Sequence, residues 1–362
     1  MFLKSAWYAA AFAEDLNHAL LPRTIVGERL VLWRRADGTP AALEDSCAHR
    51  RLPLSMGKLD GDNLQCAYHG IVYDGGGRCV RVPGEARVPE GAGVRAYPVV
   101  ERWGFVWVWT GEAAAADPAL IPDFSAAEAP GWLSANLHLK LKAFYQLHLD
   151  NLLDLSHIGF VHATTTGNAA VVEQGAVATE CDGETVYVRR RQHDIPPPAM
   201  FAEFGKFDGR VDMWQITEWK APCYVRLNYG AVPTGKPVPA EPGLYWTNGD
   251  WGFRVFQCST PETERTTHQF RCIKFDPRGA SDRTIARFRE QLDQVSFEDA
   301  PVLAAQQAAL EADERASPVD LLSTLATSSD IGPSHMRRII AARLASQGHV
   351  AGPSPRVELR IG

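Results

Sequence analysis

Short runs rich in β-branched and aromatic residues fill residues 25–110 and predict β-strands. The segments TIVGERLVLWRR, IVYDGGGRCVRVPG and PVVERWGFVWVWTG are separated by turns that contain glycine and proline. An acidic, alanine- and proline-rich stretch follows at 111–132 and has the composition of a boundary segment. We therefore expect two domains, residues 1–120 and 121–362, the first of them all-β.

The second half of the chain mixes strand-like and helical patterns. Strands are expected in the segments ETVYVRRRQ, CYVRLNYGAV, GFRVFQC and THQFRCIKF. A long helix is expected after Ser281, which is a suitable N-cap. Its apolar face would carry Ile285, Phe288, Leu292 and Val295. This combination predicts an α+β domain, in which a sheet is flanked by helices.

A final amphipathic helix is expected at 333–346, with Pro333 in its first turn. Its apolar positions are Met336, Ile339, Ile340 and Leu344, and its outer face is expected to carry Arg337, Arg338 and Arg343. We interpret these arginines as a solvated helix face rather than as a nucleic-acid contact. The formal net charge of -6 agrees, because nucleic-acid binders work through a basic field.

One helical stretch, HLDNLLDLSHIGFVHA at 148–163, carries polar groups where a buried helix would be apolar. Asn151, Asp154 and His157 recur at three-residue intervals and would share one face of a regular helix, and His162 follows. A single polar residue on such a face is usually a satisfied core group. Three of them in register, with a second histidine close by, favour a functional site.

A second polar constellation combines cysteine and histidine. Cys47-x-His49 is followed after sixteen residues by Cys66-x-x-His69, so two loops each offer one thiolate and one imidazole. Structural zinc is one interpretation, although zinc fingers usually pair Cys with Cys and His with His. A Rieske [2Fe-2S] cluster needs two thiolates on one iron and two imidazoles on the other, and this pattern supplies them. We favour the two-iron cluster.

A mononuclear iron that binds O2 needs two histidines and one carboxylate on one face of an octahedron. His157 and His162 could be the imidazoles. Five residues turn about 140° on a regular helix, so we expect the helix to be distorted or to end near Gly159. On the long C-terminal helix, Asp299 falls in the apolar stripe, where a carboxylate must be paired or metal-bound. Asp299 is the expected third ligand; an internal salt bridge is the alternative, and Glu298 is the reserve candidate.

Composition narrows the choice of compartment and partners. Seven scattered cysteines without a CxxC pair favour reduced thiols or metal ligation over a disulfide framework. No stretch approaches the roughly 18 apolar residues of a membrane span, so we expect a cytoplasmic protein without a membrane contact. No GxGxxG motif follows a strand. A separate reductase would therefore have to bind NADH and flavin.

Three segments, CAH…CAYHG, NLLDLSHIGFVH and FEDAPVLAAQQ, occur in this order across nearly the whole chain. Through them the chain resembles the oxygenase component of the Rieske non-haem iron oxygenases, most of all the single-subunit branch that contains vanillate and dicamba O-demethylases. The resemblance implies that the [2Fe-2S] cluster is held by Cys47, His49, Cys66 and His69. It implies that the catalytic Fe(II) is held by His157, His162 and Asp299.

The same resemblance implies the fold and the assembly. The expected fold is an all-β Rieske domain followed by a helix-grip catalytic domain with a curved antiparallel sheet. Members associate as head-to-tail homotrimers, in which Asp154 would bridge a cluster histidine of a neighbouring subunit to an iron-ligating histidine. Asn151 would lie near the iron.

The expected activity is that of a monooxygenase that uses O2, with electrons from NADH delivered through a ferredoxin or flavin reductase. Hydroxylation of a methoxy carbon on a small aromatic acid would release formaldehyde and leave a phenol. N-demethylation, methyl hydroxylation and ring hydroxylation are alternatives. A Rieske electron-transfer protein and a zinc-stabilised binding module are rivals from other classes. The first would leave His157, His162 and Asp299 unexplained, and the second would be colourless and inert toward O2.

Substrate contacts are expected from one strand. In CYVRLNYGAV, Tyr224, Arg226 and Asn228 alternate onto one face. If that face lines the pocket, Arg226 could pair with a substrate carboxylate and Asn228 could hydrogen-bond a phenol or ether. The alternative is a solvent-facing row. Gln257 is a further candidate.

Overall fold

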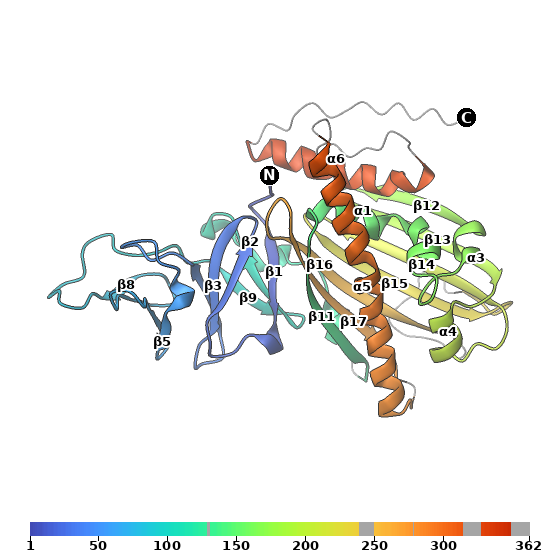
Figure 1. The fold of residues 1–362 in the computed structure, drawn as a ribbon, viewed down its shortest axis with the longest axis horizontal. Helices are drawn as coiled ribbons and strands as arrows, with labels where there is room; N and C mark the ends of the chain where they lie inside the picture. The colour runs from blue at the N-terminus through green and yellow to red at the C-terminus, as the bar shows by residue number, and fades with distance from the viewer. Residues whose placement is uncertain (129–130, 239–249, 278, 314–326, 349–362) are drawn as a thin grey trace. The chain divides into compact units, whose positions relative to one another are not determined.

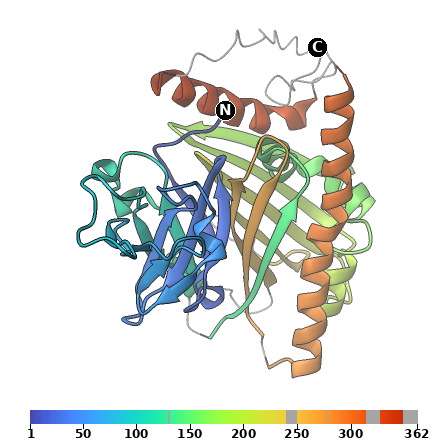
Figure 2. The same ribbon diagram turned by 60° about the vertical axis from the view of Figure 1, so that its left-hand side comes forward.

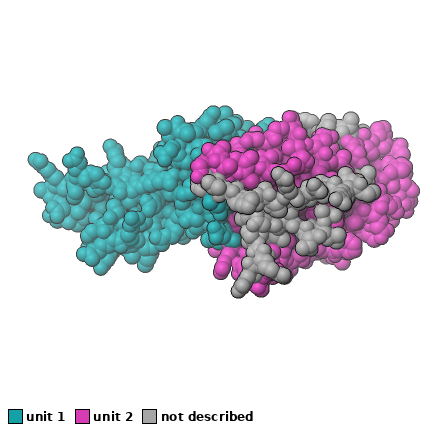
Figure 3. Space-filling view, turned by 90° about the horizontal axis from the view of Figure 1, so that it is seen from above, with its two compact units in different colours: residues 1–123, 260–264 teal, residues 124–259, 265–362 magenta. Residues whose placement is uncertain are grey.

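A computed structural model of the chain describes residues 1–128, 131–238, 250–277, 279–313 and 327–348. The chain divides into two compact units, residues 1–123 with 260–264 and residues 124–259 with 265–362 (Figure 3). No helix in these described ranges is long and apolar enough to cross a membrane.

The first unit is built from short strands in three sheets, as the short runs of β-branched and aromatic residues predict. One sheet contains β1 (Trp7–Phe12), β10 (Phe105–Trp109) and β9 (Val99–Arg102), and another contains β2 (Leu21–Ile25), β3 (Glu28–Arg34) and β4 (Pro40–Glu44). The third contains β5 (Lys58–Asp60), β6 (Asn63–Gln65), β7 (Val72–Tyr73) and β8 (Cys79–Arg81). Short 3₁₀ helices lie at Ala13–Asp15, Leu54–Met56, Ala113–Ala115 and Pro118–Leu120.

A seven-stranded sheet dominates the second unit (Figure 1). Its order is β11 (Leu133–Leu141), β17 (Thr267–Phe275), β16 (Trp251–Pro261), β15 (Tyr224–Pro233), β14 (Val211–Lys220), β13 (Thr185–Ile195) and β12 (Gly175–Asp182). Strands β16 and β17 are buried along their whole length. The large antiparallel sheet with helices confirms the expected fold class.

The helices of the second unit pack against this sheet and against one another. They are η5 (Ser125–Glu128), α1 (Tyr145–Leu153), η6 (Leu155–His157), α2 (Ile158–Val161), α3 (Ala169–Glu173), α4 (Ala199–Phe204), α5 (Asp282–Ala312), η7 (Ser328–Asp330) and α6 (Ile331–Ser346). Helix α1 contacts α5, α6 and β14. Figure 2 shows α5 as a long rod beside the sheet, with α6 above the sheet near the upper end of α5.

The long helix α5 begins where the sequence predicts. The side chain of Ser281 accepts a hydrogen bond from the backbone N–H of Thr284, so it caps the first turn. Pro301 lies inside the helix. The buried positions continue past it at intervals of three or four, at Phe288, Leu292, Ser296, Asp299, Leu303 and Gln307. The apolar stripe therefore keeps its phase and carries Asp299 inward, as expected.

Helix α6 corrects one prediction. Met336, Ile340 and Leu344 are buried, as expected. Arg337, however, is only 7% exposed, although it was expected on the outer face. Its guanidinium forms an ion pair with Asp150 of α1 and donates to Oε1 of Gln146 at 3.1 Å. Because α6 packs on α1, a long cationic side chain at this position reaches a half-buried carboxylate.

Candidate metal centres and pocket

The four residues of the cluster motif come from two loops of the first unit. Cys47 follows β4 and Cys66 follows β6, and both are buried. Gly57 marks a close approach of the chain, because a Cβ atom there would lie 2.1 Å from the carbonyl oxygen of Gln65. The hydroxyl of Tyr73 lies 3.2 Å from Cys47 Sγ and accepts from the backbone N–H of Ala48.

The spacing of these four donors suits a two-iron cluster better than a single zinc. The thiols of Cys47 and Cys66 are close enough for each to affect the other electrostatically, and the Nδ1 atoms of His49 and His69 are 3.2 Å apart on exposed rings. Across the described residues, no three of these donor atoms lie within 4.8 Å of one another. A tetrahedral zinc with bonds of roughly 2.0–2.3 Å needs its ligand atoms about 3.3–3.8 Å apart. Buried thiolates at one end and exposed imidazoles at the other fit the [2Fe-2S] arrangement.

In the second unit, His157, His162 and Asp299 converge as a candidate metal site. Their ligand atoms all lie within 4.8 Å of one another. Asp299 Oδ1 is 3.2 Å from His162 Nε2 and 3.7 Å from His157 Nε2. Asp299 and His162 are buried, and His157 is half-buried. Two imidazole nitrogens and one carboxylate oxygen on one side of a cavity fit the facial set that non-haem iron uses.

A break in the helix brings the two histidines together, and it lies earlier than expected. Helix α1 ends at Leu153, and Asp154 has an extended backbone with φ -93° and ψ 101°. The Asp154 carboxylate then accepts a hydrogen bond from Ser156 N–H at 2.7 Å, which starts the turn that contains His157. His162 comes directly after α2. The expected continuous row was therefore wrong beyond Asn151, and the expected end near Gly159 was placed too late.

The Nδ1 atom of each of the two histidines has a hydrogen-bond partner in the chain. His157 Nδ1 donates to the carbonyl oxygen of Asp154 at 2.6 Å, since a carbonyl can only accept. His162 Nδ1 lies 2.8 Å from Glu298 Oε2, which also accepts from Thr165 Oγ1 at 3.0 Å. Such contacts fix the tautomer and leave Nε2 for a metal. Glu298, the reserve candidate for the third ligand, therefore contacts His162 and does not lie among the candidate metal ligands.

Asp154 makes a different contact from the one expected, and Asn151 lies beside the candidate metal site. Asp154 reaches His157 through its backbone carbonyl and not through its carboxylate, so the expected carboxylate–imidazole contact within the chain is corrected. Asn151 Nδ2 donates to Asp299 Oδ1 at 3.1 Å. Its Oδ1 is buried without a hydrogen-bond partner in the described part of the chain. Asn151 thus orients Asp299 and leaves one acceptor beside the candidate metal site.

Charges around the site keep the carboxylate ionised. Burial lowers the pKa of His157, against the opposing charge of Asp299. Burial also acts to lower the pKa of His162, but contacts with Asp299 and Glu298 outweigh it and raise this pKa. Burial acts to raise the pKa of Asp299, but the two imidazoles outweigh it and lower this pKa. An ionised Asp299 remains available as a metal ligand.

Two side chains from the sheet form hydrogen bonds to the segment that carries His157 and His162. Arg190 of β13 is 3% exposed, and its Nη1 donates to the carbonyl oxygen of Leu155 at 2.6 Å. The hydroxyl of Tyr229 on β15 donates to the carbonyl oxygen of Thr166 at 2.5 Å. Buried hydrogen bonds to these two carbonyls restrain the backbone on both sides of the two imidazoles.

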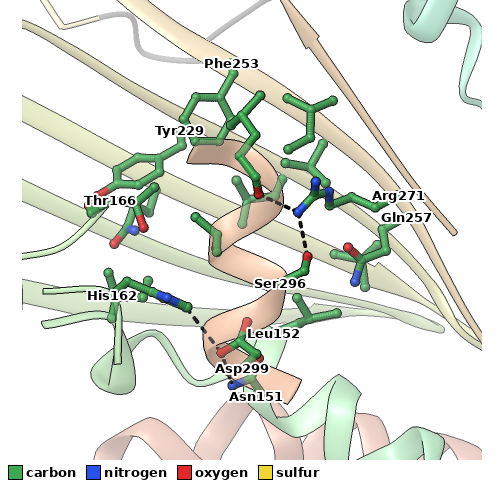
Figure 4. Close-up of a pocket in the computed structure, with 18 of the residues that line it drawn as sticks. Asn151, Leu152, His162, Thr166, Tyr229, Phe253, Gln257, Arg271, Ser296 and Asp299 are labelled. Atoms are coloured by element: carbon green, nitrogen blue, oxygen red, sulfur yellow. Dashed lines mark hydrogen bonds and ion pairs between the residues drawn. The ribbon is translucent and has the colours of Figure 1, made fainter. Parts of the chain in front are cut away.

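A mostly apolar pocket opens next to the candidate metal site (Figure 4). In this view His162, Asp299 and Asn151 lie toward the lower left, and Arg271 and Gln257 lie toward the right. His157 and Ser296 also line the pocket. The apolar lining comes from α1, its continuation, the sheet and α5: Leu152, Leu155, Ile158, Val225, Leu227, Phe253, Val255, Ile273, Leu292 and Val295. A cavity of this kind suits an aromatic ring.

The polar wall of the pocket was missed by the sequence analysis except for Gln257. Gln269 Nε2 donates to Gln257 Oε1 and to Ser296 Oγ, each at 3.2 Å. Arg271 donates to Ser296 Oγ and to Asp293 Oδ1, each at 2.5 Å. Burial lowers the pKa of Arg271 to about 10, with Asp293 opposing. The alternation of THQFRCIKF could have placed Gln269 and Arg271 on one strand face.

The other expected substrate contacts lie on the wrong face of β15. The pocket is lined by the alternate residues Val225, Leu227 and Tyr229. Arg226 Nη2 is 2.6 Å from Glu218 Oε2, its neighbour on β14, and does not line the pocket. Asn228 Oδ1 accepts from Trp214 Nε1 at 3.0 Å and also lies outside the pocket lining. The alternation was expected correctly, but the opposite set faces the cavity.

Comparison with known proteins agrees with both sites. The Rieske [2Fe-2S] domain family matches residues 6–98, and the vanillate O-demethylase oxygenase C-terminal domain family matches residues 141–346. The vanillate O-demethylase oxygenase subunit of Pseudomonas sp. (strain HR199 / DSM 7063) is 32% identical over 97% of both chains. The toluene-4-sulfonate monooxygenase system iron-sulfur subunit of Comamonas testosteroni is 34% identical over 75% of this chain and 78% of its own.

The crystal structure of dicamba monooxygenase with non-haem iron and dicamba is also similar. It superposes with a TM-score of 0.78 at 29% identity and covers 96% of this chain and 98% of its own. The Rieske domain, the oxygenase domain and the candidate metal site thus occur together in one chain. The chain belongs to the Rieske non-haem iron oxygenases, as the oxygenase component of an aromatic monooxygenase.

Proposed function

We propose that the protein O-demethylates a small methoxy-aromatic acid and releases formaldehyde. The observation that carries this proposal is the convergence of His157, His162 and Asp299 at the edge of a mostly apolar pocket that also has a polar wall. An aromatic ring fits the apolar lining, and a substrate acid fits near Arg271. The names of the vanillate and dicamba relatives support demethylation as the reaction class.

In this proposal the motif residues hold the two metal groups. Cys47, His49, Cys66 and His69 hold the [2Fe-2S] cluster, and His157, His162 and Asp299 hold Fe(II). When bound, the cluster supplies electrons and the iron supplies activation of O2. One oxygen atom enters the methyl carbon and the other leaves as water. The hydroxylated carbon then separates as formaldehyde and leaves a phenol on the ring.

The chain's own residues position the reactants. Leu227, Val255 and Phe253 exclude water around the ring, and Gln257 lies on the polar wall that would hold the substrate's acid end. Asn151 holds Asp299 in place through its Nδ2. Because these side chains are in position before the substrate binds, less free energy is needed to arrange the site for reaction.

A separate ferredoxin or flavin reductase would deliver electrons from NADH, and this implies a cytoplasmic location. The relatives support such a partner, because several are named as components or subunits of oxygenase systems. A variant in which cluster formation is prevented, Cys66→Ala, should lose NADH-dependent turnover while the candidate iron site stays intact. Iron retained at the mononuclear site, read by EPR of its nitrosyl adduct, is the control.

We further propose a head-to-tail homotrimer in which Asp154 connects the two centres of neighbouring subunits. The cluster histidines are exposed, and Tyr68 beside them is 60% exposed. In the second unit Phe160, close to the iron-site histidines in sequence, is 80% exposed. Exposed apolar side chains of this size favour contact with another surface. The Asp154 Oδ2 atom accepts no hydrogen bond from the described residues and is available to a partner imidazole.

Two measurements test these proposals. Purified protein, reductase and NADH should release formaldehyde from at least one methoxybenzoate, in step with product whose mass is lower by one CH2. Turnover without formaldehyde, for instance ring hydroxylation, would overturn the proposed reaction. Asp154→Asn should keep both metals and lose coupled turnover, and normal activity of this variant would remove the bridging role.

A further inference from the structure

Gln215 is a pocket residue to which the proposed function gives no role. It lies on β14, opposite Tyr229 of β15, and it lines the pocket with a fully buried side chain. Neither its amide oxygen nor its amide nitrogen has a hydrogen-bond partner among the described residues. Burial of an unpaired amide is unfavourable. Two unpaired atoms of one side chain in a ligand cavity therefore indicate a missing partner.

The surroundings of Gln215 do not supply that partner. The hydroxyl of Tyr229 is already used, because it donates to the carbonyl oxygen of Thr166 at 2.5 Å. The pocket residues that follow on β15 and β16 are apolar: Leu227, Phe253 and Val255. On β13 the register partner of Gln215 is Arg190, whose Nη1 donates to the carbonyl oxygen of Leu155 and whose Nε also has no partner among the described residues. The partner must come from a bound molecule, and it has to offer a donor to Oε1 and an acceptor to Nε2.

We propose that Gln215 is a specificity-determining residue that binds a hydroxyl group on the substrate ring. A hydroxyl donates to Oε1 and accepts from Nε2, so it satisfies both amide atoms. A carboxylate or an ether offers only acceptors and leaves Oε1 unpaired. This inference rests on the proposed function, from which it takes the aromatic ring and its methoxy group.

The sheet order separates this hydroxyl subsite from the acid end of the pocket. Gln215 lies on β14 and Arg271 on β17, with β15 and β16 between them. Three strand spacings place their backbones about 14 Å apart. Their long side chains reach inward from the two sides of the cavity. The hydroxyl and the acid of the substrate are therefore expected on different sides of the ring.

The test uses three probes that differ at one ring position: 4-hydroxy-3-methoxybenzoate, 3,4-dimethoxybenzoate and 3-methoxybenzoate. Their dissociation constants are measured by calorimetry on anaerobic, iron-loaded enzyme, so that no turnover is involved. The wild type should bind the hydroxyl probe about 10-fold more tightly than either other probe. Gln215→Leu and Gln215→Met should reduce that preference to within about 2-fold, with little change for 3-methoxybenzoate.

Thr217→Val is the matched control. Thr217 lies two residues further along β14 on the same face, is fully buried, and its hydroxyl is also unpartnered in the described part of the chain, but it does not line the pocket. This variant should keep the hydroxyl preference. A preference that survives in both Gln215 variants overturns the inference, as does an unselective wild type, which would point to a buried water at Gln215.

Failure of the proposed function would give a different result from failure of the Gln215 inference, because it is read by formaldehyde release. Formaldehyde release from the same three probes, assayed with reductase and NADH, reports on demethylation whatever the role of Gln215. Release of formaldehyde without a Gln215-dependent preference contradicts the inference alone. Absence of binding and of formaldehyde with all three probes contradicts the proposed function and the inference with it.

Discussion

His148 should cause the second unit to lose stability in mild acid. The side chain lies on α1 and is 1% exposed. Its Nδ1 is 3.1 Å from Ser259 Oγ, and its Nε2 is 3.4 Å from Gln257 Nε2. Burial lowers the pKa of His148 to about 4 from the ordinary value of 6.5, although the charge of Asp299 opposes this change. The folded protein therefore keeps this imidazole neutral.

The sign and size of the effect follow from proton linkage. Between pH 6.5 and pH 4 the unfolded chain binds a proton at His148 and the folded chain does not, so stability falls as the pH falls through this window. At pH 5 the loss amounts to about 2 kcal/mol relative to pH 7, because each tenfold difference in proton affinity corresponds to about 1.4 kcal/mol. His148→Gln can keep a hydrogen bond to Ser259 but has no proton to gain.

The assay is urea unfolding of wild type and variant at pH 7 and pH 5, followed by tryptophan fluorescence. The variant is less stable than wild type at pH 7, because its core is disturbed, but the difference should shrink by about 2 kcal/mol at pH 5. His18→Gln, which removes an exposed histidine, is the control. A difference between wild type and His148→Gln that is the same at both pH values would refute the reasoning.

Three further changes have defined outcomes. Arg337→Met leaves its half-buried carboxylate partner on α1 unpaired and should lower the free energy of unfolding, measured by urea titration, by about 2–4 kcal/mol. A loss below about 1 kcal/mol contradicts a stabilising ion pair at this position. Glu298→Gln weakens the support of His162 and should lower Fe(II) affinity about 10–100-fold in a chelator competition, whereas unchanged affinity rules out that role. Arg190→Met should speed amide hydrogen exchange across 155–171 relative to the wild type, while the cluster EPR signal persists. Exchange at the wild-type rate would show that the hydrogen bond from Arg190 is not needed to hold this segment.

The parts of the site that could be predicted from sequence are those fixed by local chemistry. The cluster motif depends on residue types at short spacing, because two loops each carry one thiolate and one imidazole. Asp299 follows from helix phase, since a 31-residue helix with a sound N-cap keeps its periodicity to position 299. Both inferences need only the chain's own geometry, without knowledge of what packs against it.

The parts that could not be predicted depend on tertiary packing. Asp154 interrupts α1 although no glycine or proline marks the break, because its carboxylate caps the next turn. The alternation of β15 identifies two faces but does not say which one meets the pocket, so Arg226 and Asn228 were assigned to the wrong side. The pattern of the C-terminal helix alone predicts an exposed Arg337, because its ion-pair partner lies on another helix, α1.

The central claim is that one chain holds a two-iron cluster and a separate single iron at His157, His162 and Asp299. Iron analysis of reconstituted wild type and Asp299→Ala, combined with EPR of the reduced cluster, tests it most directly. We predict about three irons per chain in the wild type, about two in the variant, and the same Rieske signal in both. Zinc in place of iron, or an unchanged iron content in the variant, would contradict the account.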